Sequence, residues 1–146
     1  MTRLTDQPLV LEDLLAETAD PSCGALIVFA GTVRNHNDGR DVNRIDYSAY
    51  APLAERTMAE IETETLQRFD IQACRVCHRI GALEIGDVSI YAVVRAGHRA
   101  EAFEAGRFAV EALKHRVAVW KREHYADGDA EWLDGTALTD DPTATQ

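Results

Sequence analysis

The stretch 24-GALIVFAGTV-33 predicts a buried strand, because positions 25–30 are apolar without interruption. A run of this length that is apolar on both faces is typical of a strand in the interior of a sheet. The next seven residues, 34-RNHNDGR-40, are polar and contain the turn pair Asp38-Gly39. Val42 to Tyr50 then returns as a second strand, and a hairpin is the simplest connection between the two.

Outward from this pair, the pattern alternates between helical and extended segments. Helical spacing predicts helices over Leu9 to Thr18, Leu53 to Phe69 after Pro52, and Arg99 to Val117, where Gly106 permits close approach of another element. Further strands are predicted at Ile71 to Ile80, Val88 to Val94, Trp120 to Tyr125 and Glu131 to Leu133. The order predicts a mixed α+β fold with hairpins, in one domain over residues 1–146, with Thr136 to Gln146 as a flexible tail.

Composition limits the class of function. The net charge of -10 argues against general binding to nucleic acid or to a membrane surface, and no apolar run reaches the roughly 18 residues of a membrane span. Three cysteines and an N-terminus without a secretory pattern favour a reducing cytoplasm. Residues 95–122 nevertheless hold 7 Lys/Arg against 3 Asp/Glu, so positive charge is gathered where it can attract a small anion. A solvated basic helix face explains that stretch equally well.

Lysine occurs only at Lys114 and Lys121, and every other fixed cation is an arginine. An ammonium group suits acid/base or nucleophilic chemistry, whereas a guanidinium mainly binds. The helical pattern places Lys114 at the edge of the buried face, and an extended segment after Val117 brings Lys121 to the same neighbourhood. The alternative is a chance pair of surface lysines in an arginine-biased composition.

Two other segments carry candidate binding groups. Arg34 and His36 follow the first strand and lie on one side of it, where ligand groups commonly collect, although a polar turn accounts for both residues as well. His98 and Arg99 open the third predicted helix, where free backbone N–H groups, an imidazole and a guanidinium form a plausible anion cradle. The alternative there is an ordinary helix-start loop.

Cys74 and Cys77 have the spacing of a metal or redox pair but lie in a predicted strand, where residues three apart face opposite sides. Ordinary packing is therefore the favoured interpretation. The chain has no Walker loop, dinucleotide fingerprint or zinc-protease motif, so no metal site and no nucleotide cofactor are indicated.

In order, these motifs resemble the large, catalytic subunit of molybdopterin synthase over roughly residues 20–133. The resemblance is carried by 31-GTVRNHN-37, 78-HRIG-81, Gly86-Asp87, His98-Arg99 with 102-AFEA-105, and Lys114 leading to 120-WKRE-123. It implies a sulfurtransferase that converts cyclic pyranopterin monophosphate to molybdopterin in molybdenum cofactor biosynthesis. It also implies a partner, a small ubiquitin-like carrier whose C-terminal glycine bears the thiocarboxylate sulfur. This chain has no Gly-Gly terminus, so it is not expected to be the carrier or a fusion to it.

The resemblance further implies an α/β hammerhead-type fold with an additional small antiparallel β subdomain. The assembly it implies is a homodimer of large subunits that forms a heterotetramer with the carrier. The substrate-binding residues carried over are Thr32, Val33, Arg34, His98, Arg99, Lys114, Lys121, Arg122 and Glu123. Lys114 is expected to act as acid, base or transient nucleophile, and Lys121 to stabilise developing negative charge. Neither metal nor ATP is implied. Ser48 and Ala118 depart from the Glu and Pro common in the family, which affects loop geometry more than chemistry.

Overall fold

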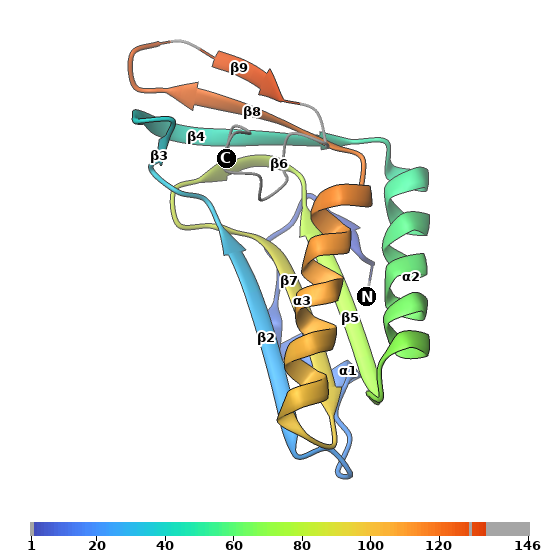
Figure 1. The fold of residues 1–146 in the computed structure, drawn as a ribbon. Helices are drawn as coiled ribbons and strands as arrows, with labels where there is room; N and C mark the ends of the chain where they lie inside the picture. Colours follow the sequence, from blue (N-terminus) through green and yellow to red (C-terminus); the bar gives the residue numbers. More distant parts are fainter. Residues whose placement is uncertain (1, 129, 134–146) are drawn as a thin grey trace.

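The computed structural model describes residues 2–128 and 130–133, with two sheets and three helices (Figure 1). The predicted tail from Thr136 to Gln146 lies outside the described residues. The helices are α1 (Leu11–Glu17), α2 (Ala51–Arg68) and α3 (Arg99–Arg116). The strands are β1 (Leu4–Thr5), β2 (Ala25–Thr32), β3 (His36–Asn37), β4 (Arg40–Ala49), β5 (Ala73–Arg79), β6 (Gly81–Glu84), β7 (Val88–Ala96), β8 (Val119–Tyr125) and β9 (Ala130–Leu133). The predicted mixed α+β class is confirmed.

The first sheet has the strand order β1-β5-β7-β2 and carries the main core. Helices α2 and α3 cover one face and α1 packs against the other (Figure 1). Alternation along β5 divides the cysteines as predicted: Cys74 joins the core under α2 and α3, while Cys77 packs with Leu14 of α1. Burial raises the pKa of the Cys74 thiol to about 12 and that of Cys77 to about 11. Both behave as packing residues.

The second sheet crosses the C-terminal end of α3 (Figure 1) and has the order β3-β4-β8-β9, with β6 paired to β4. Its small core consists of Val33, Val42, Ile45, Leu83 and Tyr125. Asp38 and Gly39 both have positive φ, 52° and 74°, as the tight β3–β4 turn requires. The predicted turn is therefore confirmed. The strand β6 was not predicted, since its residues were assigned to a turn.

The predicted hairpin between the first two long strands is wrong. β2 pairs along its length with β7, and β4 belongs to the second sheet, where it pairs with β8. The prediction that β2 lies inside its sheet is also wrong, because β2 is the edge strand. Its outer face keeps Leu26 and Val28 40% and 37% exposed. An apolar run on both faces fits either position, so the pattern alone does not separate them.

The two long helices predicted from the sequence are confirmed as α2 and α3. α3 packs against β2 through Gly106, where an added Cβ would meet Ile27 Cγ2 at 3.2 Å, so the predicted close approach is confirmed. In α2, Met58, Ile61 and Thr65 form the predicted buried stripe. Leu66 was assigned to the same stripe but is 41% exposed.

Candidate active site

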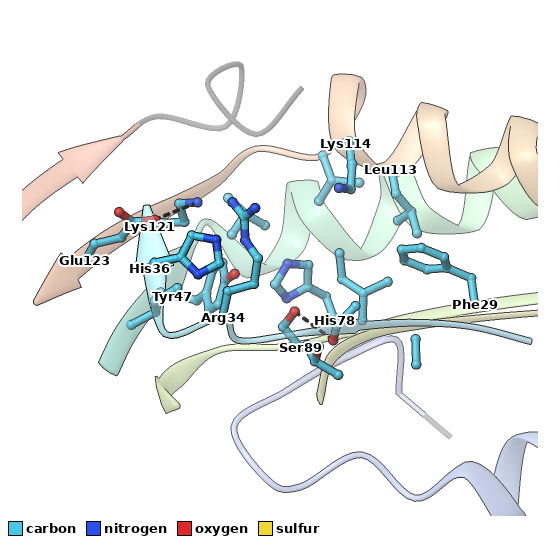
Figure 2. Close-up of a pocket in the computed structure, with 17 residues that line it drawn as sticks. Phe29, Arg34, His36, Tyr47, His78, Ser89, Leu113, Lys114, Lys121 and Glu123 are labelled. Atoms are coloured by element: carbon cyan, nitrogen blue, oxygen red, sulfur yellow. Dashed lines mark hydrogen bonds and ion pairs between the residues drawn. The ribbon is translucent and has the colours of Figure 1, made fainter. Parts of the chain in front are cut away.

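A cavity of about 410 Å³ opens where the two sheets meet at the C-terminal end of α3 (Figure 2). This size lies within the range of small-molecule sites. Its polar lining comes from seven helices and strands and the β2–β3 loop: Thr32, Arg34, His36, Tyr47, His78, Ser89, Lys114, Lys121 and Glu123. The apolar wall includes Phe29, Ile45, Ile90, Leu113, Val117 and Val119. The structure thus brings together both lysines of the chain.

The two lysines reach the cavity from different elements, Lys114 from the end of a helix and Lys121 from a strand. Lys114 lies in the last turn of α3 and is half-buried, directly after the buried Leu113. The helix ends at Arg116, and Val117 turns the chain into β8. Alternation along β8 then directs Val119, Lys121 and Glu123 inward. A helix end followed at once by a strand is what places the two ammonium groups on one cavity.

Lys121 is held by a buried network around Glu123. The Lys121 Nζ lies 2.9 Å from Glu123 Oε1, and only 8% and 2% of the two side chains are exposed. Asn37 Nδ2 and the Tyr125 hydroxyl both donate to Glu123 Oε2, at 2.6 and 2.8 Å. A buried charge needs a partner and further hydrogen bonds, and Glu123 supplies the first while Asn37 and Tyr125 supply the second. The network fixes the position of Lys121 rather than leaving Glu123 to contact a ligand.

Positive charge is concentrated at the cavity. Arg34 follows β2 in the loop that leads to β3, and its side chain is exposed. Figure 2 shows Arg34, Lys114 and Lys121 around one opening, with His36 beside them. Glu123 is the one carboxylate among the lining residues, and it is already paired. Three cations against one engaged carboxylate make the cavity suitable for an anion such as a phosphate.

The base of the cavity holds polar groups that the sequence did not indicate. Burial raises the pKa of Tyr47 to about 12, and Tyr47 shares a hydrogen bond with Ser89. Burial also lowers the pKa of His78 to about 4, while its Nδ1 lies 2.8 Å from the Arg79 carbonyl oxygen. The Tyr47 and His78 rings meet edge to face, with centroids 5.0 Å apart. His78 is therefore a neutral imidazole at physiological pH.

Four of the predicted site residues do not line this cavity. His98 and Arg99 are exposed at the opposite end of α3, about 22 Å from Lys114 by the rise of the helix. Val33 is buried in the core of the second sheet, and its backbone N–H and C=O bond to Asp87 and Gly86. Arg122 falls on the other face of β8 from Lys121 and Glu123.

Several residues of the site had no clear signal in the sequence. Asn37 was noted in the polar turn and within the motif 31-GTVRNHN-37 but was not assigned to the site, and Tyr47, Ser89 and Tyr125 were noted only as strand residues. Ser89 Oγ lies 3.3 Å from the Gly31 carbonyl oxygen, which ties β7 to the end of β2. His78 was noted within a motif but not assigned to the site. Among the described residues, no group of His, Cys, Asp and Glu side chains forms a metal site.

Comparison with known proteins identifies the family of this chain. The model of the family described as "MoaE protein" matches residues 4–116. The chain belongs to the MoaE family. It is 43% identical over 131 residues to "Molybdopterin synthase catalytic subunit 1" of Mycobacterium tuberculosis, covering 90% of this chain and 88% of that protein.

Solved structures of this family share the fold. The crystal structure of molybdopterin synthase from Staphylococcus aureus aligns with a TM-score of 0.85 at 31% identity, over 90% of this chain and 96% of that one. A protein–protein complex of subunits 1 and 2 of molybdopterin-converting factor from Helicobacter pylori aligns with a TM-score of 0.72 at 20% identity, over 89% and 88% of the two chains. At that identity the second comparison supports the fold alone. No helix among the described residues is long and apolar enough to cross a membrane.

Proposed function

We propose that this protein is the catalytic subunit of a molybdopterin synthase, a sulfurtransferase of molybdenum cofactor biosynthesis. It converts cyclic pyranopterin monophosphate to molybdopterin with two sulfurs from the thiocarboxylated C-terminus of a small ubiquitin-like carrier subunit. The observation that carries the proposal is the meeting of Lys114, Lys121 and Arg34 on one cavity in a chain that has no other lysine. Family membership supplies the reaction, and the cavity supplies groups suited to it.

Each residue has a role that follows from the chemistry of its side chain. Arg34 holds the phosphate of the precursor with the planar fork of its guanidinium, beside the hydroxyl of Thr32. Lys114 meets the carrier's terminal carbonyl carbon, as acid, base or transient nucleophile. Lys121, fixed by Glu123, stabilises the negative charge that develops as sulfur leaves that carbon. No step needs a metal or ATP.

In this proposal, His98 and Arg99 of one copy of the chain reach the cavity of a second copy. Within one copy the length of α3 separates them from Lys114. Both residues follow the end of β7, and β7 pairs with β2, the exposed edge of the first sheet. Leu26 and Val28 leave apolar surface on that edge strand. A homodimer formed there would carry each His98-Arg99 pair toward the partner copy, and one carrier on each copy would complete a heterotetramer.

Other parts of the proposal rest on the family. The larger sheet with its helices corresponds to the α/β hammerhead-type fold, and the second sheet to the additional small antiparallel subdomain, in one domain. A cytoplasmic location fits the three cysteines, which are all free thiols. Val33 and Arg122 take a supporting role, in which Val33 anchors the loop that carries Arg34.

The deciding experiment combines the protein with the cyclic precursor and a thiocarboxylated carrier, and detects the dithiolene product by mass. We expect Lys114→Ala to abolish product while the protein stays folded. His115→Ala is the matched control, because His115 is the exposed neighbour of Lys114 on α3 and lies outside the cavity. Wild-type rates in Lys114→Ala would reject the catalytic role of Lys114. If the wild-type protein binds the precursor but forms no product, it is an anion-binding module, and if it neither binds nor converts the precursor, it is a structural partner protein.

The contribution of a second copy has its own test. Lys114→Ala and Arg99→Ala proteins, each inactive alone, are mixed under conditions that exchange subunits. If the sites are shared, about a quarter of wild-type activity returns, because half of the dimers are mixed and each mixed dimer has one intact site. No recovery in exchanged dimers would reject a site shared between two copies.

A further inference from the structure

His78 occupies a special position on the first sheet. Residues 74, 76 and 78 of β5 share one face, and Cys74 and Val76 are covered by the main core. At His78 the helical cover ends and the cavity begins, so the imidazole lines it while remaining 97% buried, with 3% of the residue exposed. Figure 2 shows the ring at the base of the cavity, between Ser89 and Arg34. A buried polar side chain that faces a cavity calls for a partner.

The contacts of His78 determine which ring nitrogen carries the proton. Nδ1 lies 2.8 Å from the Arg79 carbonyl oxygen, and a carbonyl can only accept a hydrogen bond. Nδ1 therefore bears the hydrogen, and Nε2 of the neutral ring presents a lone pair. Within the part of the chain that the structure describes, no side chain donates to Nε2. The Tyr47 ring contacts the imidazole edge to face, which holds its plane.

The charged groups of the cavity offer a ligand no other acceptor, and the hydroxyls of Thr32, Tyr47 and Ser89 are donors as well as acceptors. Arg34, Lys114 and Lys121 are donors only. The Glu123 oxygens are already engaged by Lys121, Asn37 and Tyr125. His36 also lines the cavity, but its side chain is exposed and water competes for it. His78 is thus a buried acceptor opposite a group of cations, and a ligand that fits both must have an anionic end and an N–H end.

We infer that Nε2 of His78 accepts a hydrogen bond from a ring N–H or amino group of the bound heterocycle, and so orients the ring while the cations hold its phosphate. The inference rests on the proposed function and adds a substrate-positioning residue to it. A purine or pterin carries such donors on the edge of its ring, whereas a simple phosphate ester has only the anionic end. His78 therefore selects among phosphorylated ligands and contributes little to binding of phosphate itself.

The direct test observes the wild-type imidazole by nitrogen-15 NMR while cyclic pyranopterin monophosphate is added. We expect Nε2 of His78 to resonate as an unprotonated nitrogen at pH 7 and to move upfield as the precursor binds. Inorganic phosphate should leave it in place. His115 is the internal control, since its Nδ1 also bonds a carbonyl, that of Glu111, but its ring lies outside the cavity. An Nε2 resonance that stays fixed at saturation with precursor overturns the inference.

A variant gives a second readout. His78→Asn can keep a donor near the Arg79 carbonyl, but its side chain is too short to place an acceptor at the position of the His78 Nε2. We expect about tenfold weaker binding of the precursor and unchanged binding of inorganic phosphate, because one ligand donor is left without a partner. Equal losses for both ligands would indicate general damage to the site and contradict the inference. If the wild-type protein binds no precursor, the proposed function fails too. If it binds and turns over precursor but neither His78 readout responds, the positioning role alone fails.

Discussion

Glu123→Gln isolates the charge that holds Lys121 in place. A glutamine side-chain oxygen can still accept the bonds from Asn37 and Tyr125, but the ammonium of Lys121 loses its counter-ion at a site where 8% of its side chain is exposed. Removing one partner of a buried pair costs about 3–5 kcal/mol. Because Lys121 borders an open cavity and can recruit water, we expect the lower end, about 3 kcal/mol.

The assay is urea unfolding followed by far-ultraviolet circular dichroism at fixed protein concentration. With a slope of about 1.5 kcal/mol/M, the midpoint should fall by about 2 M. Lys121→Met in the same background should restore part of the loss, because it removes the unpaired charge, and the double-mutant cycle then gives the coupling between the two residues. A loss below about 1 kcal/mol would refute the reasoning, since that value is typical of a solvent-exposed pair.

Three further outcomes follow from other parts of the fold. Native protein at pH 8 should react with a thiol reagent at Cys23 alone, because Cys74 and Cys77 are buried and burial raises the pKa of both thiols. In denaturant all three cysteines should react. Rapid labelling of all three in the native protein would contradict the packing of β5. Gly106→Leu should destabilise the protein by about 2–3 kcal/mol through overpacking against Ile27, measured by urea unfolding, whereas the exposed Phe103→Leu should be close to neutral. Burial lowers the pKa of His78 to about 4 in the folded protein, against 6.5 for the free group, so the unfolded chain takes up its proton first as the pH falls. The free energy of unfolding should therefore drop by about 3 kcal/mol between pH 6.5 and pH 4, and this drop should be smaller in His78→Asn. The same pH dependence in both proteins would place His78 in solvent.

Local features of the fold were predictable because they depend on neighbours in sequence. The spacing of apolar residues located α2 and α3, and Asp38-Gly39 located the β3–β4 turn. Strand pairing was not predictable in the same way. β2 pairs with β7 across more than fifty residues, and nothing in the alternation along β2 distinguishes that partner from β4. The short β6 was missed because two glycines and an acidic residue in one segment also describe a turn.

The site residues show the same difference between local features and contacts made only in the folded chain. Lys114 and Lys121 were found because lysine is rare in this chain, and the change from helix to strand after Val117 brought them together as expected. The partners of Glu123 come from β3 and from the far end of β8, so only the folded chain reveals that Glu123 supports Lys121. His98 and Arg99 were expected in the same cavity as Lys114, although the predicted helix from Arg99 to Val117 already implies a rise of about 22 Å between Arg99 and Lys114.

The central claim is that both lysines face one ligand, and the chain offers a simple way to observe them. Protein labelled with carbon-13 only in lysine should give two sets of side-chain signals, one from Lys114 and one from Lys121, since there are no others. On titration with cyclic pyranopterin monophosphate, both sets should move and should yield one shared dissociation constant. Movement of a single set, or of neither at saturating precursor, would contradict the account.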